Sequence, residues 1–135
     1  MAKLFLIFLV CLNSLVFSKE VINNINIKSD SIEFFKELNK INFNNNVEIK
    51  SEYINIEALS AVYDEKNSVI SLIGMPTTIS SIKKDNTFKG TADKVVFHTN
   101  EEVHLIGNAK MIYDNLTISS EFIIFNPITG KISSD

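Results

Sequence analysis

The sequence has few of the residues that enzymes and metal proteins use most often at their sites. Its 135 residues include one cysteine, two histidines, four glycines, two prolines and no tryptophan. The single cysteine, Cys11, lies in an N-terminal apolar run, so we expect the rest of the chain to contain no disulfide, thiol nucleophile or thiolate metal site. The low glycine and proline content excludes a collagen-like chain.

An excess of positive charge is also absent. The chain carries 13 basic and 16 acidic residues, which gives a formal net charge of −3 at pH 7. Nucleic-acid binding uses a basic surface that neutralises phosphates, so this charge argues against a nucleic-acid partner. The length is enough for one hydrophobic core and too short for two independent cores of ordinary size.

The first 18 residues, MAKLFLIFLVCLNSLVFS, have the three parts of a secretory signal. Lys3 supplies the positive start, an apolar run follows from Leu4 to Phe17, and the small Ser18 closes the segment. This run is shorter than the roughly 20 apolar residues that a membrane-spanning helix needs. We therefore expect a signal peptide over residues 1–18, cleaved near Ser18, and one domain over residues 19–135. An uncleaved membrane anchor is the alternative.

Apolar and polar residues alternate with a period of two along most of the remaining chain. Clear examples are the INI triplets at residues 25–27 and 54–56. Such alternation is typical of half-buried β-strands. Clusters of Asn, Asp and Lys separate the runs and predict turns. Residues 31–40 come nearest to a helical spacing, but they fit a strand and a turn equally well. The pattern predicts an all-β domain.

Two short patterns recur along the chain. LIGMPTTI at residues 72–79 and LIGNAKMI at residues 105–112 share four of eight residues. In a second pattern, a small residue precedes a branched and then an aromatic residue, at residues 57–64, 91–98 and 119–126. We interpret the domain as repeated copies of one β-motif of roughly thirty residues, stacked into an elongated sheet structure with two open ends.

Residues that tolerate unusual backbone angles interrupt the strand patterns. Gly74, Gly107 and the Asn45-Asn46 pair each lie inside an apolar alternation. Such residues often mark a bulge or corner at which a sheet folds over on itself. We therefore expect a twisted V or jelly roll lined by alternate Ile, Val, Leu, Phe and Met side chains. A closed core filled by the same side chains is the alternative.

The order of these segments resembles the OstA-like family, that of the periplasmic lipopolysaccharide-transport protein A. The resemblance covers nearly all of the chain after the signal segment, and its clearest pieces are KGTADKVVF and LIGNA. It implies an antiparallel, twisted, V-shaped β-jelly roll of repeated strand pairs with open ends. The other matching pieces are INIKSD, KINFNNNVEI, YINIEALSAVYD and LTISSEFIIFNPITGKI.

The resemblance also implies a function. It implies that the chain carries lipopolysaccharide from the inner to the outer membrane in the periplasm of a Gram-negative bacterium, with the lipid A acyl chains shielded inside the roll. It implies no enzymatic activity and no cofactor. The implied partners are lipopolysaccharide, inner-membrane protein C, the outer-membrane translocon and further copies of the chain, joined head to tail. A related structural module that joins such complexes without carrying lipid is the alternative.

We expect lipid to contact the more apolar face of each alternating run, and partners to pair with the sheet edges at residues 22–27 and at residues 122–125 or Ile132. Branched and flexible apolar side chains without a directional polar anchor suit a sliding acyl chain. The candidate lining residues are Ile25, Ile27, Ile41, Phe43, Val47, Ile49, Ile54, Ile56, Leu72, Val96, Leu105, Met111, Ile118 and Ile124.

The polar residues do not form a recognisable catalytic set or metal site. His98 and His104 lie on neighbouring strand patterns, but a zinc site requires further ligands, so we expect two exposed strand residues. Asp93 and Glu121 stand at repeat positions, and no nucleophile paired with a base is visible. A hydrolase or metal enzyme is a third hypothesis, and the residue inventory argues against it.

Overall fold

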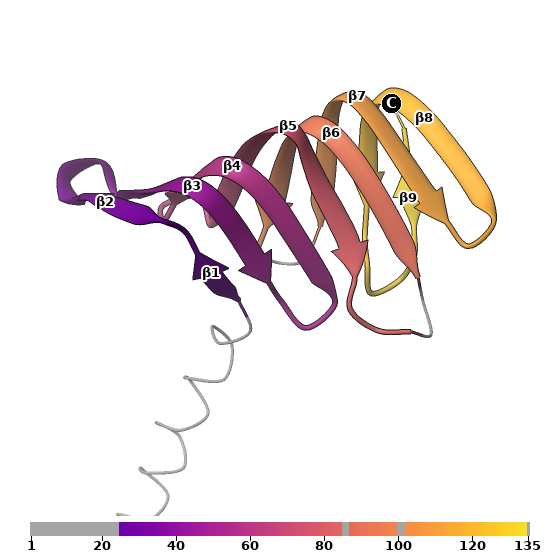
Figure 1. The fold of residues 1–135 in the computed structure, drawn as a ribbon, viewed down its shortest axis with the longest axis horizontal. Helices are drawn as coiled ribbons and strands as arrows, with labels where there is room; N and C mark the ends of the chain where they lie inside the picture. Colours follow the sequence, from indigo (N-terminus) through magenta and orange to yellow (C-terminus); the bar gives the residue numbers. More distant parts are fainter. Residues whose placement is uncertain (1–24, 85–86, 100–101, 135) are drawn as a thin grey trace, which may run out of the picture.

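The structure, a computed structural model, describes residues 25–84, 87–99 and 102–134 (Figure 1). The signal peptide predicted for residues 1–18 lies outside the described residues. Within these ranges, no helix has the length and the apolar character that a membrane crossing requires.

The described chain forms one antiparallel sheet of nine strands, so the all-β prediction is confirmed. The strands lie in sequence order across the sheet, except that both β1 and β2 pair with β3. Residues 31–40 form β2, the 3-10 turn η2 (Lys36–Leu38) and the start of β3. The strands are β1 (Asn26–Lys28), β2 (Ser31–Phe35), β3 (Lys40–Lys50), β4 (Ile54–Asp64), β5 (Val69–Ser81), β6 (Phe88–His98), β7 (Val103–Tyr113), β8 (Leu116–Phe125) and β9 (Ile132–Ser133).

The long strands β3 to β8 all bend near their middles, and the sheet folds over into the predicted V-shaped roll (Figure 1). The pairing register shifts at the same place in every adjacent pair of these strands. The bends fall at residues 45–46, 59, 74–76, 93, 107–108 and 121. We call residues 40–44, 60–64, 69–73, 94–98, 103–106 and 122–125 the first arm, and residues 47–50, 54–58, 77–81, 88–92, 109–113 and 116–120 the second arm.

Residues with left-handed backbone angles form the bends of β3 and β7. Asn45 and Asn46 have φ angles of 65° and 52°, and Gly107 and Asn108 have φ angles of 82° and 47°. Glycine and asparagine adopt such angles more readily than other residues, which is why these corners are predictable from the sequence. Gly74, the third predicted corner, lies in the bend of β5.

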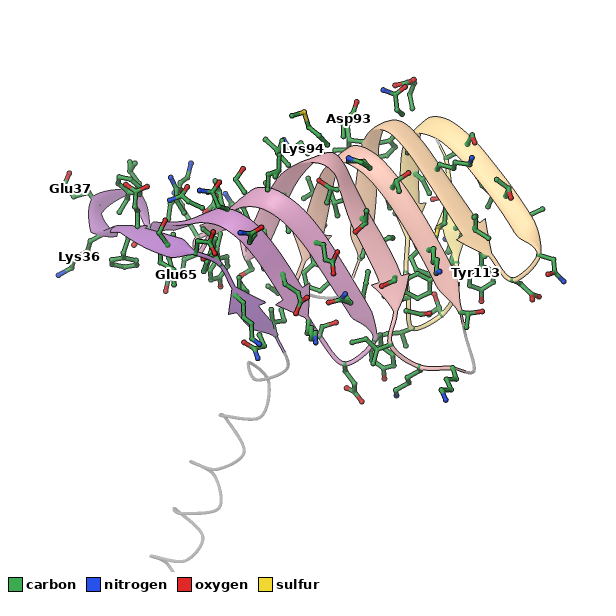
Figure 2. The ribbon with its side chains drawn as sticks, in the orientation of Figure 1. Lys36, Glu37, Glu65, Asp93, Lys94 and Tyr113 are labelled. Atoms are coloured by element: carbon green, nitrogen blue, oxygen red, sulfur yellow. The ribbon has the colours of Figure 1, made fainter. Side chains whose placement is uncertain are left out.

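Polar side chains connect neighbouring bends along the ridge of the roll. The Asn108 side-chain amide donates a hydrogen bond to Asp93 Oδ2 at 3.0 Å, and the Asn108 backbone N–H donates one to Glu121 Oε2 at 3.4 Å. Figure 2 shows Asp93 on this ridge, next to Lys94. Asp93 and Glu121 therefore help to hold β6, β7 and β8 together where these strands bend.

The inner faces of the two arms form one hydrophobic core. Residues that pair across adjacent strands make continuous apolar rows. One row is Leu72-Val95-Leu105-Ile123 in the first arm, and another is Ile49-Ile56-Ile79 in the second. Every member of these two rows is at most 2 % exposed. Burial of the rows, rather than local propensity, fixes the register of the sheet.

Substitution of Gly107 tests the bend of β7. Its φ angle of 82° is disfavoured for a β-branched residue, and an added Cβ would lie 2.8 Å from Asp93 Oδ2. We expect Gly107→Val to lower the free energy of unfolding by about 2–3 kcal/mol in urea denaturation. Asn45→Gly is the control, because glycine also adopts its φ of 65°, and we expect a change below about 0.5 kcal/mol. An unchanged stability of Gly107→Val would mean that the bend does not need its left-handed geometry.

Candidate functional site

Most of the candidate lining residues lie together on the inner faces of the two arms. One group is buried in the core, and a second group is partly buried and packs against the first. The buried group is Phe43, Val47, Ile49, Ile54, Ile56, Leu72, Leu105 and Met111, and the partly buried group is Ile25, Ile27, Ile41 and Ile118. The structure thus brings these side chains into one apolar interior that extends along the whole roll.

Val96 and Ile124 lie on the opposite, outer face of the sheet, so their predicted inward orientation is wrong. Both are half-buried, whereas their neighbours Val95 and Ile123 are fully buried in the core. The reason is the number of residues in each bend. A one-residue bend in β6 and in β8 moves the inner face from even-numbered to odd-numbered residues, whereas the two-residue bends of β3 and β7 preserve the alternation.

Sequence reasoning missed several large side chains of the interior. Phe97 and Phe125 are fully buried, and Phe88, Ile70 and Ile79 are 2 % exposed. A usable signal exists for the first two, because each is the aromatic residue that ends a copy of the second repeated pattern. If equivalent positions of that repeat are assumed to share one face, both rings are predicted to lie inside. The alternation within a single strand does not give this result.

The two arms touch across the interior. A Cβ atom at Gly90 in the second arm would lie 3.1 Å from Leu105 Cδ2 in the first arm, so the absence of a side chain at Gly90 permits this contact. The ring of Phe88 in the second arm meets that of Phe125 in the first edge-on, with centroids 4.6 Å apart. In this state the interior is filled by the chain's own side chains at these places.

At the N-terminal end of the roll, the apolar side chains of β2 are uncovered. Its pairing with β3 continues the inner rows of the first arm, because Ile32 pairs with Phe43 and Phe34 pairs with Ile41. Phe43 is only 6 % exposed, but Ile32 and Phe34 are 61 % and 58 % exposed. Figure 1 shows the reason: β2 projects beyond the rest of the roll.

Ile32, Phe34, Phe35 and Leu38 are all exposed, and we call this set of residues the N-terminal apolar end. Lys36 and Glu37 mark its tip (Figure 2). Of the edge predicted at residues 22–27, residues 22–24 lie outside the described residues, and β1 pairs with β3 in the second arm. The exposed apolar strand is β2, which sequence reasoning did not identify as an edge.

The C-terminal end has an open strand edge in the second arm. β9 pairs with β8 only at Ile124 and Phe125, and no further strand within the described ranges pairs with β8 on the side away from β7. The predicted edge at residues 122–125 is thus partly covered by Ile132 and its neighbours, and the Ser134 hydroxyl donates to the Phe122 carbonyl at 2.8 Å. Residues 116–120 have no strand partner on this side within the described ranges, and the Ser120 hydroxyl lies 2.7 Å from the Ser134 hydroxyl.

The outer face of the second arm is hollowed. A hollow of about 560 Å³ opens there over strands β4 to β7, and none of the candidate lining residues borders it. Charged and hydroxyl side chains line it beside the exposed Ile112, so its chemistry is more mixed than that of the apolar interior. The charged and hydroxyl residues are Glu57, Lys89, Lys110, Thr78, Ser80 and Thr91.

His98, Glu102 and His104 meet on the outer face of the first arm, where β6 leads into β7. His104 Nε2 and Glu102 Oε1 lie 2.6 Å apart, and this hydrogen bond lowers the pKa of the Glu102 carboxyl. The centroids of the His98 and His104 rings lie 4.6 Å apart. Both histidines are half-buried, so the expectation of two exposed residues is wrong: the β6–β7 pairing packs the two rings against each other.

A solved protein structure has the same overall fold as this chain. A solved structure with a similar fold is LptH, described as the LptA homologous periplasmic component of the lipopolysaccharide transport device of Pseudomonas aeruginosa. The TM-score is 0.71 at 17 % sequence identity, and the match covers 82 % of this chain and 80 % of that chain. No curated protein matches the chain in sequence.

The family comparison covers most of the chain. The family model described as LptA/(LptD N-terminal domain) LPS transport protein matches residues 26–131, from β1 to the approach to β9. These residues contain every bend, all the buried core residues and both open ends. The chain therefore belongs to the family of LptA and LptD N-terminal domain lipopolysaccharide-transport proteins.

Proposed function

We propose that the chain is a periplasmic, lipopolysaccharide-binding bridge protein that passes lipopolysaccharide from the inner to the outer membrane of a Gram-negative bacterium. In this proposal, residues 1–18 are a signal peptide cleaved near Ser18. The observation that carries it is a continuous apolar interior between two arms, with uncovered strands at both ends. The transport family and the fold of a periplasmic relative support it.

The interior has the chemistry that acyl chains require. Each methylene group kept from water contributes about 0.8 kcal/mol, so the acyl chains of lipid A need a continuous apolar cover. The inward-facing candidates supply branched and flexible hydrocarbon along both arms, and we propose that they are the shielding surface. Without a deep polar anchor, a chain can move along this surface.

The filled interior must open to admit lipid. The hydrogen bonds between β3, β4, β5, β6, β7 and β8 lie within each arm, and the bends join the two arms. Separation of the arms would therefore break side-chain contacts, such as that between Phe88 and Phe125, and leave the strand pairs intact. We propose that acyl chains enter by spreading the arms about the ridge.

The two ends support an assembly. The N-terminal apolar end and the open edge at residues 116–120 are different surfaces, so contact between them would be head to tail and would not close into a dimer. Strand addition at an open edge is a common mode of recognition. We propose that these ends join further copies of the chain, inner-membrane protein C and the outer-membrane translocon.

Photo-crosslinking in cells tests the lipid-binding proposal. We expect a crosslinking residue at Ile56 or Ile118, on the inner face of the second arm, to capture lipopolysaccharide. The same residue at Lys66, in the exposed turn between β4 and β5, serves as the control and should capture none. Equal capture at all three positions would overturn the proposal.

The alternative is a structural module of the same superfamily that joins membrane complexes without carrying lipid. The close packing of the arms at Gly90 and Leu105 favours it, because a filled core needs no ligand. Mass spectrometry of gently purified protein separates the two proposals. Retained lipopolysaccharide supports the carrier, and strand-edge pairing with a partner in the absence of lipid supports the module.

The family model describes a transport protein. We therefore propose that this chain has no enzymatic activity. The described residues offer histidines only at His98 and His104, on the outer face and away from the apolar interior. A turnover reaction that is abolished by replacing either histidine would contradict this proposal.

A further inference from the structure

The β6–β7 hairpin brings together three side chains that are separated in the sequence by spacings of four and two residues. His98 ends β6, Glu102 directly precedes β7, and His104 is the second residue of β7. The His98 backbone N–H donates to the Glu102 carbonyl at 2.9 Å, which closes the hairpin. One nitrogen or oxygen atom from each side chain lies within 4.8 Å of the other two.

One of these atoms is unsatisfied. His98 Nε2 is buried and has no hydrogen-bond partner in the described part of the chain. A buried polar atom without a partner is unfavourable, and a bound ligand or ion is one common explanation. The neighbouring groups are placed to share such an ion, because the His104 ring is held by edge-on contact with Phe122 at 5.5 Å and by the hydrogen bond to Glu102.

We propose that His98, Glu102 and His104 bind a Zn²⁺ ion. Two imidazole nitrogens and one carboxylate oxygen are ligands that zinc commonly takes, with water in the fourth position. Imidazole suits zinc better than magnesium, which prefers oxygen ligands and octahedral geometry. The sequence does not reveal Glu102 as the third ligand. Glu102 belongs to a polar segment between two strands, and only the folded hairpin places its side chain beside the two histidines.

Small movements would complete the site. With metal–ligand bonds of about 2.0–2.2 Å, tetrahedral ligand atoms lie about 3.4 Å apart. The contact of 2.6 Å between His104 Nε2 and Glu102 Oε1 would therefore widen as the ion replaces the shared hydrogen, and His98 would move inward. The Glu102 side chain is 44 % exposed, so water can reach the three ligands from its side.

The proposal does not depend on lipid carriage, because the three ligands lie outside the apolar interior. The ion would fasten the end of the β6–β7 hairpin, whose backbone is otherwise closed by the hydrogen bond between His98 and Glu102.

Isothermal titration with ZnCl₂ on the exported chain, purified without a histidine tag, tests the proposal. We expect one Zn²⁺ per chain, no comparable binding of Mg²⁺, and affinity at least about tenfold weaker for each of His98→Gln, Glu102→Gln and His104→Gln. Glu65→Gln, an exposed carboxylate at the next hairpin of the first arm, is the matched control and should bind as the parent does.

Circular dichroism of the zinc-free variants checks that each retains its strands, and a zinc-dependent rise in melting temperature gives a second readout. Both the rise and the tight binding should disappear in the three ligand variants only. Unchanged affinity in Glu102→Gln would overturn the three-ligand site, as would equal weakening in Glu65→Gln or the absence of zinc binding by the parent chain.

Discussion

Replacement of Phe125 with alanine is expected to lower the free energy of unfolding by about 3–5 kcal/mol. The Phe125 ring is fully buried and contacts two other rings, with centroids 4.6 Å from Phe88 and 6.1 Å from Tyr113. Because Phe88 and Tyr113 belong to the second arm and Phe125 to the first, the substitution removes packing that holds the arms together. Equilibrium unfolding in urea measures the loss.

Phe34→Ala is the matched control for this substitution. Phe34 is also an aromatic residue of a strand that extends the first arm, but it is 58 % exposed, so its truncation should change stability by about 0.5 kcal/mol or less. A loss below about 1 kcal/mol for Phe125→Ala would contradict the tight packing of this end of the roll. It would mean that the arms collapse around the missing ring with little penalty.

Aspartates at both Ile32 and Phe34 are expected to weaken head-to-tail association by more than about tenfold. These side chains extend the inner rows of the first arm past the point where the second arm covers them. A second copy that covers them would bury two large apolar groups, each contributing about 1.5–3 kcal/mol when fully buried. A charge at either position would have to be desolvated instead. Sedimentation velocity over a range of protein concentrations measures the association.

The matched control carries aspartates at Leu59 and Ile82. These residues are 48 % and 47 % exposed, at the bend of β4 and just after β5, and neither lies on an end of the roll. We expect this pair to leave association unchanged. If both double variants associate as the parent does, the N-terminal apolar end is not the surface through which copies join. Unfolding in urea confirms that the fold is retained, since all four positions are exposed.

Local sequence information was sufficient for β3. Its apolar residues Ile41 and Phe43 before the bend, and Val47 and Ile49 after it, keep the same period of two, and all face the interior. The Asn45-Asn46 pair bends the strand but adds two residues, so the alternation continues in phase. Backbone preference and periodicity, both properties of neighbouring residues, therefore located the strand, its corner and its buried face.

The same reasoning failed on β6 and β8 for a physical reason. Asp93 and Glu121 each form a one-residue bend, which reverses the alternation, and neither residue type signals a bend by its own backbone preference. Their role depends on Asn108 of β7, whose amide and backbone bind the two carboxylates. Periodicity within one strand predicts Val96 and Ile124 on the inner face, because it contains no information about contacts with the neighbouring strand that produce the bend.

The alternating strands and their corners at Asn45, Gly74 and Gly107 can be predicted from the residues alone, because they follow from the period of apolar residues and from backbone freedom. Three features require the folded sheet: the inward orientation of Val95 and Ile123, the uncovered projection of β2, and the meeting of Glu102 with the two histidines. Each of these depends on contacts between residues on different strands, whose relative positions are fixed by the pairing of the whole sheet.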